Sequence, residues 1–342
     1  MIRVLLAAVC LTLFAANLQA GGLDDLKAAN AAAQQGKADD AIRLYTQALA
    51  ASDLLPADQF AAHKGRGSEY TSKSLIADAF ERLDQARGLR NDAIADFTAA
   101  LKFKADDADL HVARAQVYHL NGEYDSAITD FDAALKLNNS PVSLVQRAGS
   151  LSAKGDYDRA VADYTAALDL VTKDAKDTKD TNLDAFDIHT QRGYAQFIAA
   201  HYAAAAADFD KSLTLGAAAR AGDVLWVPYQ AAWLHISRVR AGQNDAEELA
   251  RNAGKIDLKQ WPGTLIAYFL RQATLDQLTP PSSHGAMGHA RECNLAFFSG
   301  EQSLIKNDSA EAARQFTRAR AVCNIHTVHY LAAGVELKRL GK

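Results

Sequence analysis

The sequence is poor in proline and has no excess of basic residues. Six prolines in 342 residues leave long stretches free to form helix, because proline is the residue that most disfavours a helix interior. The 37 Lys and Arg are outnumbered by 41 Asp and Glu, and the formal net charge is −4. A negatively charged chain is a poor partner for nucleic acid or for anionic lipid. We therefore expect neither as a partner.

Catalytic signatures are also missing. The sequence contains no Gly-x-Ser-x-Gly elbow, no His-Glu-x-x-His pair, no Gly-Lys-Ser/Thr phosphate loop and no dinucleotide fingerprint. In enzymes that use them, these motifs place a nucleophile, a catalytic metal or a bound phosphate. The sequence therefore predicts a protein that is not an enzyme and that carries no cofactor.

Long apolar runs are confined to the N-terminus. Arg3 precedes the uncharged run Val4–Ala16, and small residues follow around Ala20 in "NLQAGG". This run is shorter than the about 20 residues of a membrane-spanning helix, and it has the charge and cleavage pattern of a signal peptide. We expect residues 1–20 to be removed on export, with no membrane insertion of the remaining chain.

One helical pattern returns along the chain. The stretch "NDAIADFTAALKF" from Asn91 returns as "DSAITDFDAALKL" from Asp125 and as "DRAVADYTAALDL" from Asp158, and in altered form as "AAAAADFDKSLTL" from Ala203. A period of about 34 residues predicts stacked helix–turn–helix units. Each unit has an Ala, then an aromatic residue and usually a second small residue, at helical spacing. A glycine expected at the turn precedes them in four units: Gly36, Gly88, Gly122 and Gly155.

This pattern resembles the tetratricopeptide repeat (TPR) family, which has the same spacing of small and aromatic residues and a glycine at the turn. The resemblance covers residues 22–216 with about five repeats, and it implies an all-α, right-handed α-solenoid of antiparallel helix pairs. Two stretches exceed the repeat length. Residues 71–87 carry apolar residues at helical spacing and predict a lengthened first helix. Residues 172–187 are charged and Thr-rich and predict a solvated loop.

Residues 224–342 differ in composition and hold all three Trp. A degenerate helix pair and a loop lead to a final repeat and a closing helix, "HTVHYLAAGVELKRLG". With "AAWLHISR", "KQWPGTLIAYFL" and "LAFFSGEQSLIKNDSAEAARQFTRA", this region resembles the C-terminal part of periplasmic TPR lipoproteins that act as adaptors for a tail-specific protease and for murein hydrolases. Those lipoproteins carry a lipidated Cys after the signal peptide, which this sequence lacks. The resemblance implies a periplasmic adaptor.

An Asp precedes the aromatic residue in four copies, and an Arg stands in the first helix of the same four, where the TPR family usually has Leu. The first repeat lacks both. We expect structural ion pairs, since a guanidinium can bind a carboxylate through two parallel hydrogen bonds. The alternative is a row of Arg that binds an anionic ligand. The residues are Arg66, Arg114, Arg147 and Arg192, with Asp96, Asp130, Asp163 and Asp208.

Two cysteines follow the signal peptide, Cys293 and Cys323. They stand at the start of the first helix of the last repeat and just after its second helix, and antiparallel helices place these two ends side by side. An exported chain enters an oxidising compartment, so we expect a disulfide between them. His289 and His326 flank the pair, which leaves a zinc site open as the alternative.

The first helices of TPR units line a concave face, where we expect a groove for a protein partner. The expected lining is mixed polar and aromatic, which suits an extended peptide or a helix. It comprises Lys64, Ser68, Asp109, Gln116, His119, Thr190, Tyr194 and Phe197.

Taken together, the sequence predicts an exported, non-catalytic scaffold or adaptor that binds protein partners in the periplasm. The expected process is cell-envelope maintenance or proteolysis, with a protease or a murein hydrolase as the kind of partner that the resemblance implies. A metal-binding protein and a structural subunit of an envelope assembly are the alternatives.

Overall fold

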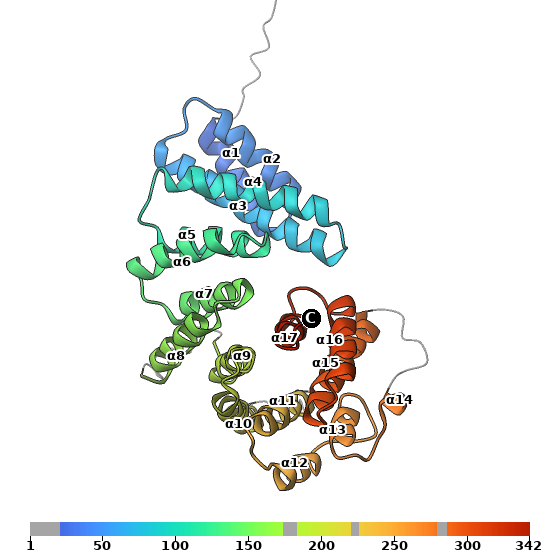
Figure 1. Ribbon diagram of the computed structural model, residues 1–342. Helices are drawn as coiled ribbons and strands as arrows, with labels where there is room; N and C mark the ends of the chain where they lie inside the picture. Colours follow the sequence, from blue (N-terminus) through green and yellow to red (C-terminus); the bar gives the residue numbers. More distant parts are fainter. Residues whose placement is uncertain (1–20, 174–182, 220–225, 279–285) are drawn as a thin grey trace, which may run out of the picture. The chain divides into compact units, whose positions relative to one another are not determined.

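The computed structural model describes residues 21–173, 183–219, 226–278 and 286–342 (Figure 1). Every regular element in these residues is a helix, and consecutive helices pack as pairs. The predicted all-α fold is therefore confirmed. The predicted signal peptide and much of the predicted loop at 172–187 lie outside the described residues.

The chain forms two compact units, one up to Val117 and one from Tyr118 onward. The sequence suggested a division between residues 216 and 224 instead. That division stays a prediction. One hydrophobic core joins Phe197 and Phe209 to Trp233, Phe297 and Phe316. The C-terminal region thus shares its core with the repeats that precede it.

The first unit holds α1 (Gly22–Gln34), α2 (Ala38–Ala50), α3 (Pro56–Ala79), α4 (Leu83–Leu101) and most of α5 (Ala108–Leu120). Neighbouring helices pack in chain order, α1 on α2, α2 on α3 and α3 on α4. Tyr45 and Phe97, the aromatic residues of the repeat pattern, are each almost completely buried. Each belongs to a small hydrophobic cluster, Tyr45 with Ala and Leu side chains and Phe97 with Ala, Leu and Val side chains.

The extra residues near 71–87 lengthen both helices of a pair. We predicted a single lengthened first helix, but α3 ends at Ala79 and α4 begins at Leu83. Glu81 takes a left-handed backbone conformation, with φ of 58°, and closes the turn. Gly88, expected at this turn, therefore lies inside α4, whereas Gly36, Gly122 and Gly155 do occupy turns with positive φ.

The second unit holds the remaining helices. In chain order they are α6 (Tyr124–Leu137), α7 (Pro141–Lys154), α8 (Tyr157–Lys173), α9 (Ala185–Ile198), α10 (Tyr202–Ala219), α11 (Val227–Arg240), α12 (Ala246–Ala253), α13 (Gly263–Phe269), α14 (Leu275–Leu278), α15 (Ala286–Ile305), α16 (Ser309–Val322) and α17 (Val328–Arg339). Helices α6 to α11 pack in sequence, α15 pairs with α16, and α17 contacts α9.

The aromatic residues of the repeats pack directly on small residues of the partner helix. A Cβ added to Gly193 would lie 2.9 Å from the Phe209 ring, and one added to Gly300 would lie 2.6 Å from the Phe316 ring. Both distances are below van der Waals contact, so only glycine allows the two helices to approach this closely. This explains why small residues recur in the first helices.

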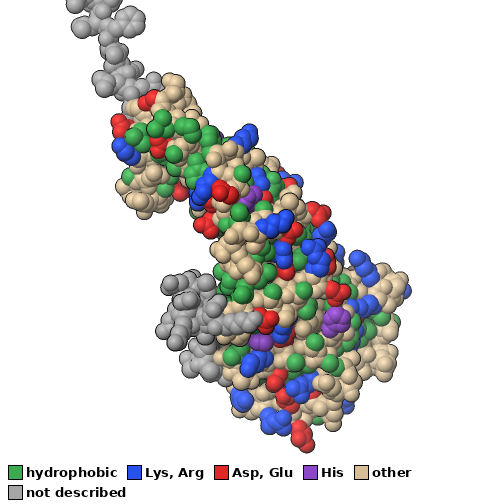
Figure 2. Space-filling model, turned by 90° about the vertical axis from the view of Figure 1, so that its left-hand side faces the viewer, with side chains coloured by type: hydrophobic (Ala, Val, Ile, Leu, Met, Phe, Trp, Pro, Cys, Tyr) green, Lys and Arg blue, Asp and Glu red, His purple; other side chains and the backbone are tan. Residues whose placement is uncertain are grey.

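The surface carries charges of both signs. On the face that Figure 2 shows, Lys and Arg side chains are interspersed with Asp and Glu side chains rather than gathered by sign. Among the described helices, none is both long and apolar enough to cross a membrane.

Candidate functional site

Three of the predicted Arg–Asp pairs are present as bidentate ion pairs inside a repeat. Arg66 binds Asp96 with both N···O distances at 2.8 Å. Arg147 binds Asp163 at 2.7 Å twice. Arg192 binds Asp208 at 2.8 and 2.7 Å. In each pair the Arg comes from the first helix and the Asp from the second. The pair therefore links the two helices of one hairpin.

The same arginines also reach back to the preceding repeat. The acceptor is each time the residue that follows the aromatic residue of that repeat. Arg66 Nη1 donates to Thr46 and Arg192 Nη1 to Thr165, at 2.8 and 3.0 Å. Arg147 Nη1 donates to Asp132 at 2.6 Å and Arg114 Nη1 to Thr98 at 2.9 Å. Each Arg is thus tied to protein acceptors in its own or a neighbouring repeat, which leaves few donors for an anionic ligand. Arg114 lies in the first unit and its expected partner Asp130 in the second, where Asp130 is buried.

Two histidines join these pairs, and the sequence reasoning missed them. Nδ1 of His63 lies 2.8 Å from Asp96, and Nδ1 of His189 lies 2.7 Å from Asp208. Burial alone would raise the pKa of both carboxyls, but the hydrogen bonds from Arg and His lower it below its usual value. The signal was present, because both histidines stand three residues before the Arg.

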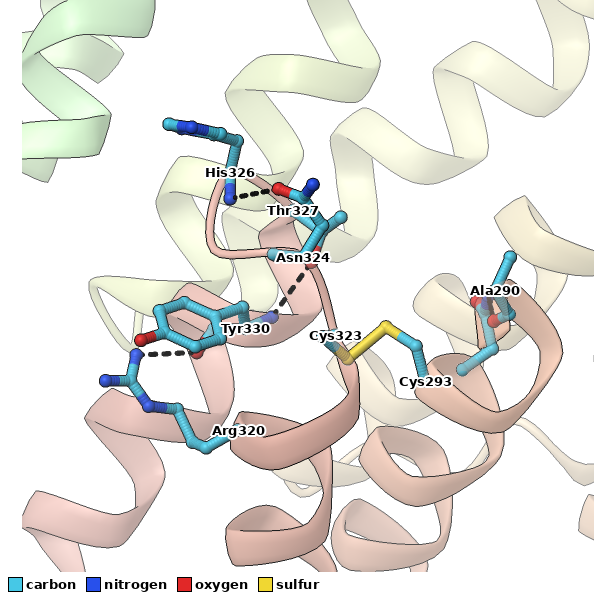
Figure 3. Close-up of a disulfide and its surroundings, with 9 residues drawn as sticks. Ala290, Cys293, Arg320, Cys323, Asn324, His326, Thr327 and Tyr330 are labelled. Atoms are coloured by element: carbon cyan, nitrogen blue, oxygen red, sulfur yellow. Dashed lines mark hydrogen bonds between the residues drawn. A yellow bond between two sulfur atoms is a disulfide. The ribbon is translucent and has the colours of Figure 1, made fainter. Parts of the chain in front are cut away.

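Cys293 and Cys323 are joined by a disulfide, with their Cα atoms 4.8 Å apart (Figure 3). Cys293 lies in α15 and Cys323 directly follows α16, so the bond ties the open end of the last helix hairpin. Beyond it the chain turns into α17. Arg320 of α16 stacks on Tyr330 of α17, with its guanidinium carbon 3.5 Å from the ring centroid.

The alternative of a zinc site loses two of its four ligands to this bond, because a disulfide has no thiolate to offer a metal. His326 sits in the turn after Cys323, and its side chain points away from the sulfur atoms in Figure 3. His289 is exposed. Among the described residues, no group of three or more His, Cys, Asp or Glu is arranged to hold a metal ion.

Four of the predicted groove residues belong to the first unit. Ser68, Asp109 and Gln116 are exposed, and Lys64 is half-buried with its ammonium 5.8 Å from the Phe60 ring. These four side chains are accessible, but none of them lines the hollow of the first unit that lies beside the α3–α4 turn. Their role in binding stays a prediction.

The groove assignment fails for two residues of the second unit. Phe197 is completely buried and packs edge-on against Trp233, while Thr190 is buried and donates to the Phe186 carbonyl. Both belong to the core because the C-terminal helices cover α9, which the repeat pattern alone does not indicate. Tyr194 is half-buried, with its ring 4.9 Å from that of Trp233.

Tyr194 and the remaining predicted residue, His119, line one hollow of the second unit, with a volume of about 210 Å³. We call it the inner hollow. Its walls are the first helices α7 and α9, parts of α5, α6 and α8, the turn before α17 and the first residues of α17. The lining is His119, Tyr124, Gly149, Ser152, Ala153, Tyr157, Tyr164, Gln191, Tyr194, Ala195, Ile198, Ile325, His326, Val328 and Leu331.

The lining of the inner hollow combines polar and apolar side chains, and none of its fifteen described residues is Asp, Glu, Lys or Arg. Burial raises the pKa of all four lining tyrosines, that of Tyr164 to about 12. Burial and the neighbouring His326 lower the pKa of His119, whose Nδ1 lies 2.9 Å from Ser150 Oγ. The tyrosines and His119 are therefore neutral at pH 7, and the hollow offers hydroxyl, amide and ring surfaces.

The closing helix α17 is fixed to the repeats by buried charges. Arg240 of α11 donates to Glu301 of α15 at 2.7 Å and to Glu336 of α17 at 3.2 Å. Arg339 of α17 donates to the carbonyl of Ile198 in α9 and pairs with Glu336. Burial raises the pKa of Glu301, and Arg240 opposes that effect, so losing Arg240 would remove the cation that stabilises this buried carboxylate, whereas Glu336 would keep Arg339. These contacts tie α17, whose Val328 and Leu331 line the hollow, to α9, α11 and α15.

Comparison with known proteins places this geometry in context. The family model of the tetratricopeptide repeat matches residues 108–141. Comparison with curated proteins finds no match to this sequence. Among solved structures, a tetratricopeptide repeat protein from Parabacteroides merdae has a TM-score of 0.51 at 14% identity, covering 91% of this chain and 98% of that chain.

Two shorter structures are also similar. YrrB, described as a TPR protein with an unusual peptide-binding site, has a TM-score of 0.45 at 18% identity, over 58% of this chain and 88% of that chain. The MamA protein has a TM-score of 0.47 at 17% identity, over 59% of this chain and 96% of that chain. Residues 108–141 therefore carry a tetratricopeptide repeat, and the chain has the fold of tetratricopeptide repeat proteins, a scaffold suited to protein–protein interaction.

Proposed function

We propose that this protein is an exported, non-catalytic scaffold whose inner hollow binds an uncharged apolar or aromatic side chain of a protein partner. The observation that carries the proposal is a tyrosine-lined, charge-free hollow between the first helices of tetratricopeptide-like units and the segment that leads into α17. Stacked helix pairs of this kind present extended binding surfaces to other proteins.

The size of the hollow favours a side chain over a metabolite. Pockets for small-molecule ligands measure about 300–1,000 Å³, whereas the inner hollow measures about 210 Å³. That space admits a side chain such as Leu or Phe, with the rest of the partner's segment lying outside. Ile325, which is 58% exposed, offers apolar surface beside it.

The chemistry of the lining favours an uncharged guest. A charged side chain would lose its hydration on entering and would find no opposite charge among the described lining residues, which is costly. Tyrosine combines apolar ring surface with a hydroxyl that can bond to a peptide group. The Gln191 amide, which is exposed, can donate to a backbone carbonyl at the opening.

Export rests on the sequence of residues 1–20, which lie outside the described residues. The disulfide between Cys293 and Cys323 supports it, because such bonds persist in oxidising compartments such as the bacterial periplasm. The resemblance of residues 224–342 to periplasmic adaptor lipoproteins supports an adaptor for cell-envelope enzymes. A protease or murein hydrolase is the class of partner that this resemblance suggests.

The test compares partners captured by the wild-type protein and by two variants. A Tyr194→Ala variant is unsuitable, because Tyr194 packs on Phe209 and Trp233 and its loss would damage the core. Ile325→Glu instead puts a charge at the hollow while sparing buried contacts. Leu137→Glu is the matched control, since Leu137 is 48% exposed and does not line the hollow.

The expected result is a set of partners from a periplasmic extract that the wild type and Leu137→Glu retain and that Ile325→Glu loses. Mass spectrometry identifies the proteins, and thermal unfolding confirms that both variants are folded. Equal recovery by all three proteins would show that the partner binds elsewhere.

A further inference from the structure

The α3–α4 turn of the first unit exposes an apolar surface that the function proposed above does not use. Four large apolar side chains on this hairpin are exposed, with exposed fractions of 49% for Leu75, 57% for Ile76, 66% for Phe80 and 67% for Leu83. We call them the hairpin-tip patch. Contiguous exposed apolar patches of this kind mark interaction sites on soluble proteins.

The patch exists because this helix pair is longer than the others. Helix α3 has 24 residues and α4 has 19, whereas α1 and α2 have 13 each. Lys73 and Asp39 form an ion pair between α3 and α2, and Arg90 and Asp78 pair across the hairpin. These two ion pairs hold the extension in place, and the apolar side chains at its tip take no part in them.

A hollow of about 440 Å³ opens beside the patch. We call it the tip hollow. Half of its lining is charged and half is not: Lys37, Asp39, Asp40, Lys73 and Arg82 stand beside Gly36, Ala38, Ile76, Ala77 and Gln85. Ile76 belongs to both the patch and the hollow. One surface therefore presents an exposed ring, Phe80, beside a recess.

The charges around the tip are balanced. Glu81, Arg82, Asp84 and Arg87 are exposed, and the structure shows none of them in an ion pair with another described residue. Arg82 lies over the Phe80 ring, 5.2 Å from its centroid. Two positive and two negative side chains thus surround the patch. An anionic membrane would select a basic rim, which this is not.

We propose that the hairpin-tip patch is the contact between two copies of this chain, related by a twofold axis. In a twofold contact the same surface meets itself, so protrusion and recess must lie on one surface and both signs of charge must surround it. The hairpin tip meets both requirements. Phe80 of each copy enters the tip hollow of the other, and Arg82 and Arg87 of each copy face Glu81 and Asp84 of the other.

The first experiment measures the molar mass of the purified chain by light scattering from low to high micromolar concentration. The wild type is expected to shift from monomer to dimer with rising concentration, and Phe80→Asp is expected to stay monomeric. Leu55→Asp is the matched control, because Leu55 is 66% exposed in the same unit and lies outside the patch. It should dimerise like the wild type. A wild type that stays monomeric overturns the proposal and leaves the patch to a different partner.

Charge exchange tests whether the second copy is the occupant. One variant, Arg82→Glu with Arg87→Glu, has an all-negative rim, and another, Glu81→Lys with Asp84→Lys, has an all-positive rim. Each alone is expected to remain monomeric, while an equimolar mixture should form mixed dimers. Dimers of either variant alone at the wild-type concentration, or a mixture that stays monomeric, contradict a self-complementary contact. Because all four side chains are on the surface, both variants are expected to fold.

Discussion

Arg192 holds Asp208 through two parallel hydrogen bonds, at 2.8 Å from Nε and 2.7 Å from Nη2, and its Nη1 reaches Thr165 of the preceding repeat at 3.0 Å. The TPR family usually has Leu at this position. In this chain a polar clamp therefore links both the helices of one repeat and the repeats to each other.

Loss of one partner of this clamp should destabilise the protein strongly. Arg192→Ala leaves the nearly buried carboxylate of Asp208 without its cation, which costs about 3–5 kcal/mol for buried pairs. Arg43→Ala is the control, since Arg43 and Asp40 form an exposed pair worth at most about 1 kcal/mol. Urea unfolding measures both. Equal, small losses in the two variants would mean that the clamp contributes little.

The clamp also predicts a loss of stability in acid. Hydrogen bonds from Arg192 and His189 lower the pKa of Asp208 against the opposing effect of burial. Because the folded-state pKa lies below that of the unfolded chain, the stabilisation is complete above about pH 4 and is lost as pH falls through the folded-state pKa. Urea midpoints measured from neutral pH downward should fall in that acid range, and less steeply for Asp208→Asn. An identical pH profile for the variant contradicts this assignment.

The disulfide should stabilise the second unit. It closes a loop with a sequence separation of 30, for which the chain-entropy model gives roughly 3–4 kcal/mol. The double variant Cys293→Ser, Cys323→Ser should unfold at a lower temperature, as should the reduced wild type. The non-reduced wild type without residues 1–20, which contain Cys10, should have no alkylatable thiol. The double variant has no disulfide to reduce. If a reductant lowers its melting temperature as well, the effect on the wild type cannot be assigned to this bond.

Two glycines that sequence reasoning treats as special should respond oppositely to alanine. At Gly193 the new Cβ would meet the Phe209 ring at 2.9 Å, so overpacking should cost about 1–3 kcal/mol. At Gly88 the new Cβ meets nothing within 4 Å and the residue lies inside α4, so stability should rise by about 0.5–1 kcal/mol. If Gly88→Ala destabilises the protein instead, the result would contradict a helical Gly88 and support the turn that the sequence predicted there.

The repeat spacing correctly predicted features that depend only on residues close together in the sequence, such as the buried face of a helix. Ala93, Phe97 and Ala100 fall on the buried face of α4 because their spacing alone defines that face. The position of the turn before α4 was not predictable in this way. With both helices lengthened, the chain uses Glu81 rather than a glycine for the left-handed residue.

The candidate site depends on contacts between distant parts of the chain. Tyr194 and Phe197 looked like neighbours on one groove face, yet Phe197 is covered by Trp233 and Phe297 of the C-terminal region. The inner hollow exists because Ile325 and Leu331 come to lie beside α7 and α9. The spacing of residues within one repeat does not predict which distant segment packs against it.

The most direct test of the proposed function is site-specific photo-crosslinking in intact cells. A photoreactive phenylalanine replaces Ile325 at the inner hollow in one strain and Leu137 in another, and each product is identified by mass spectrometry. We expect a defined crosslinked partner from position 325 and none from position 137, with the crosslinked peptide centred on an uncharged apolar or aromatic residue. Failure to crosslink from position 325, or the same partner from position 137, would contradict binding at the inner hollow.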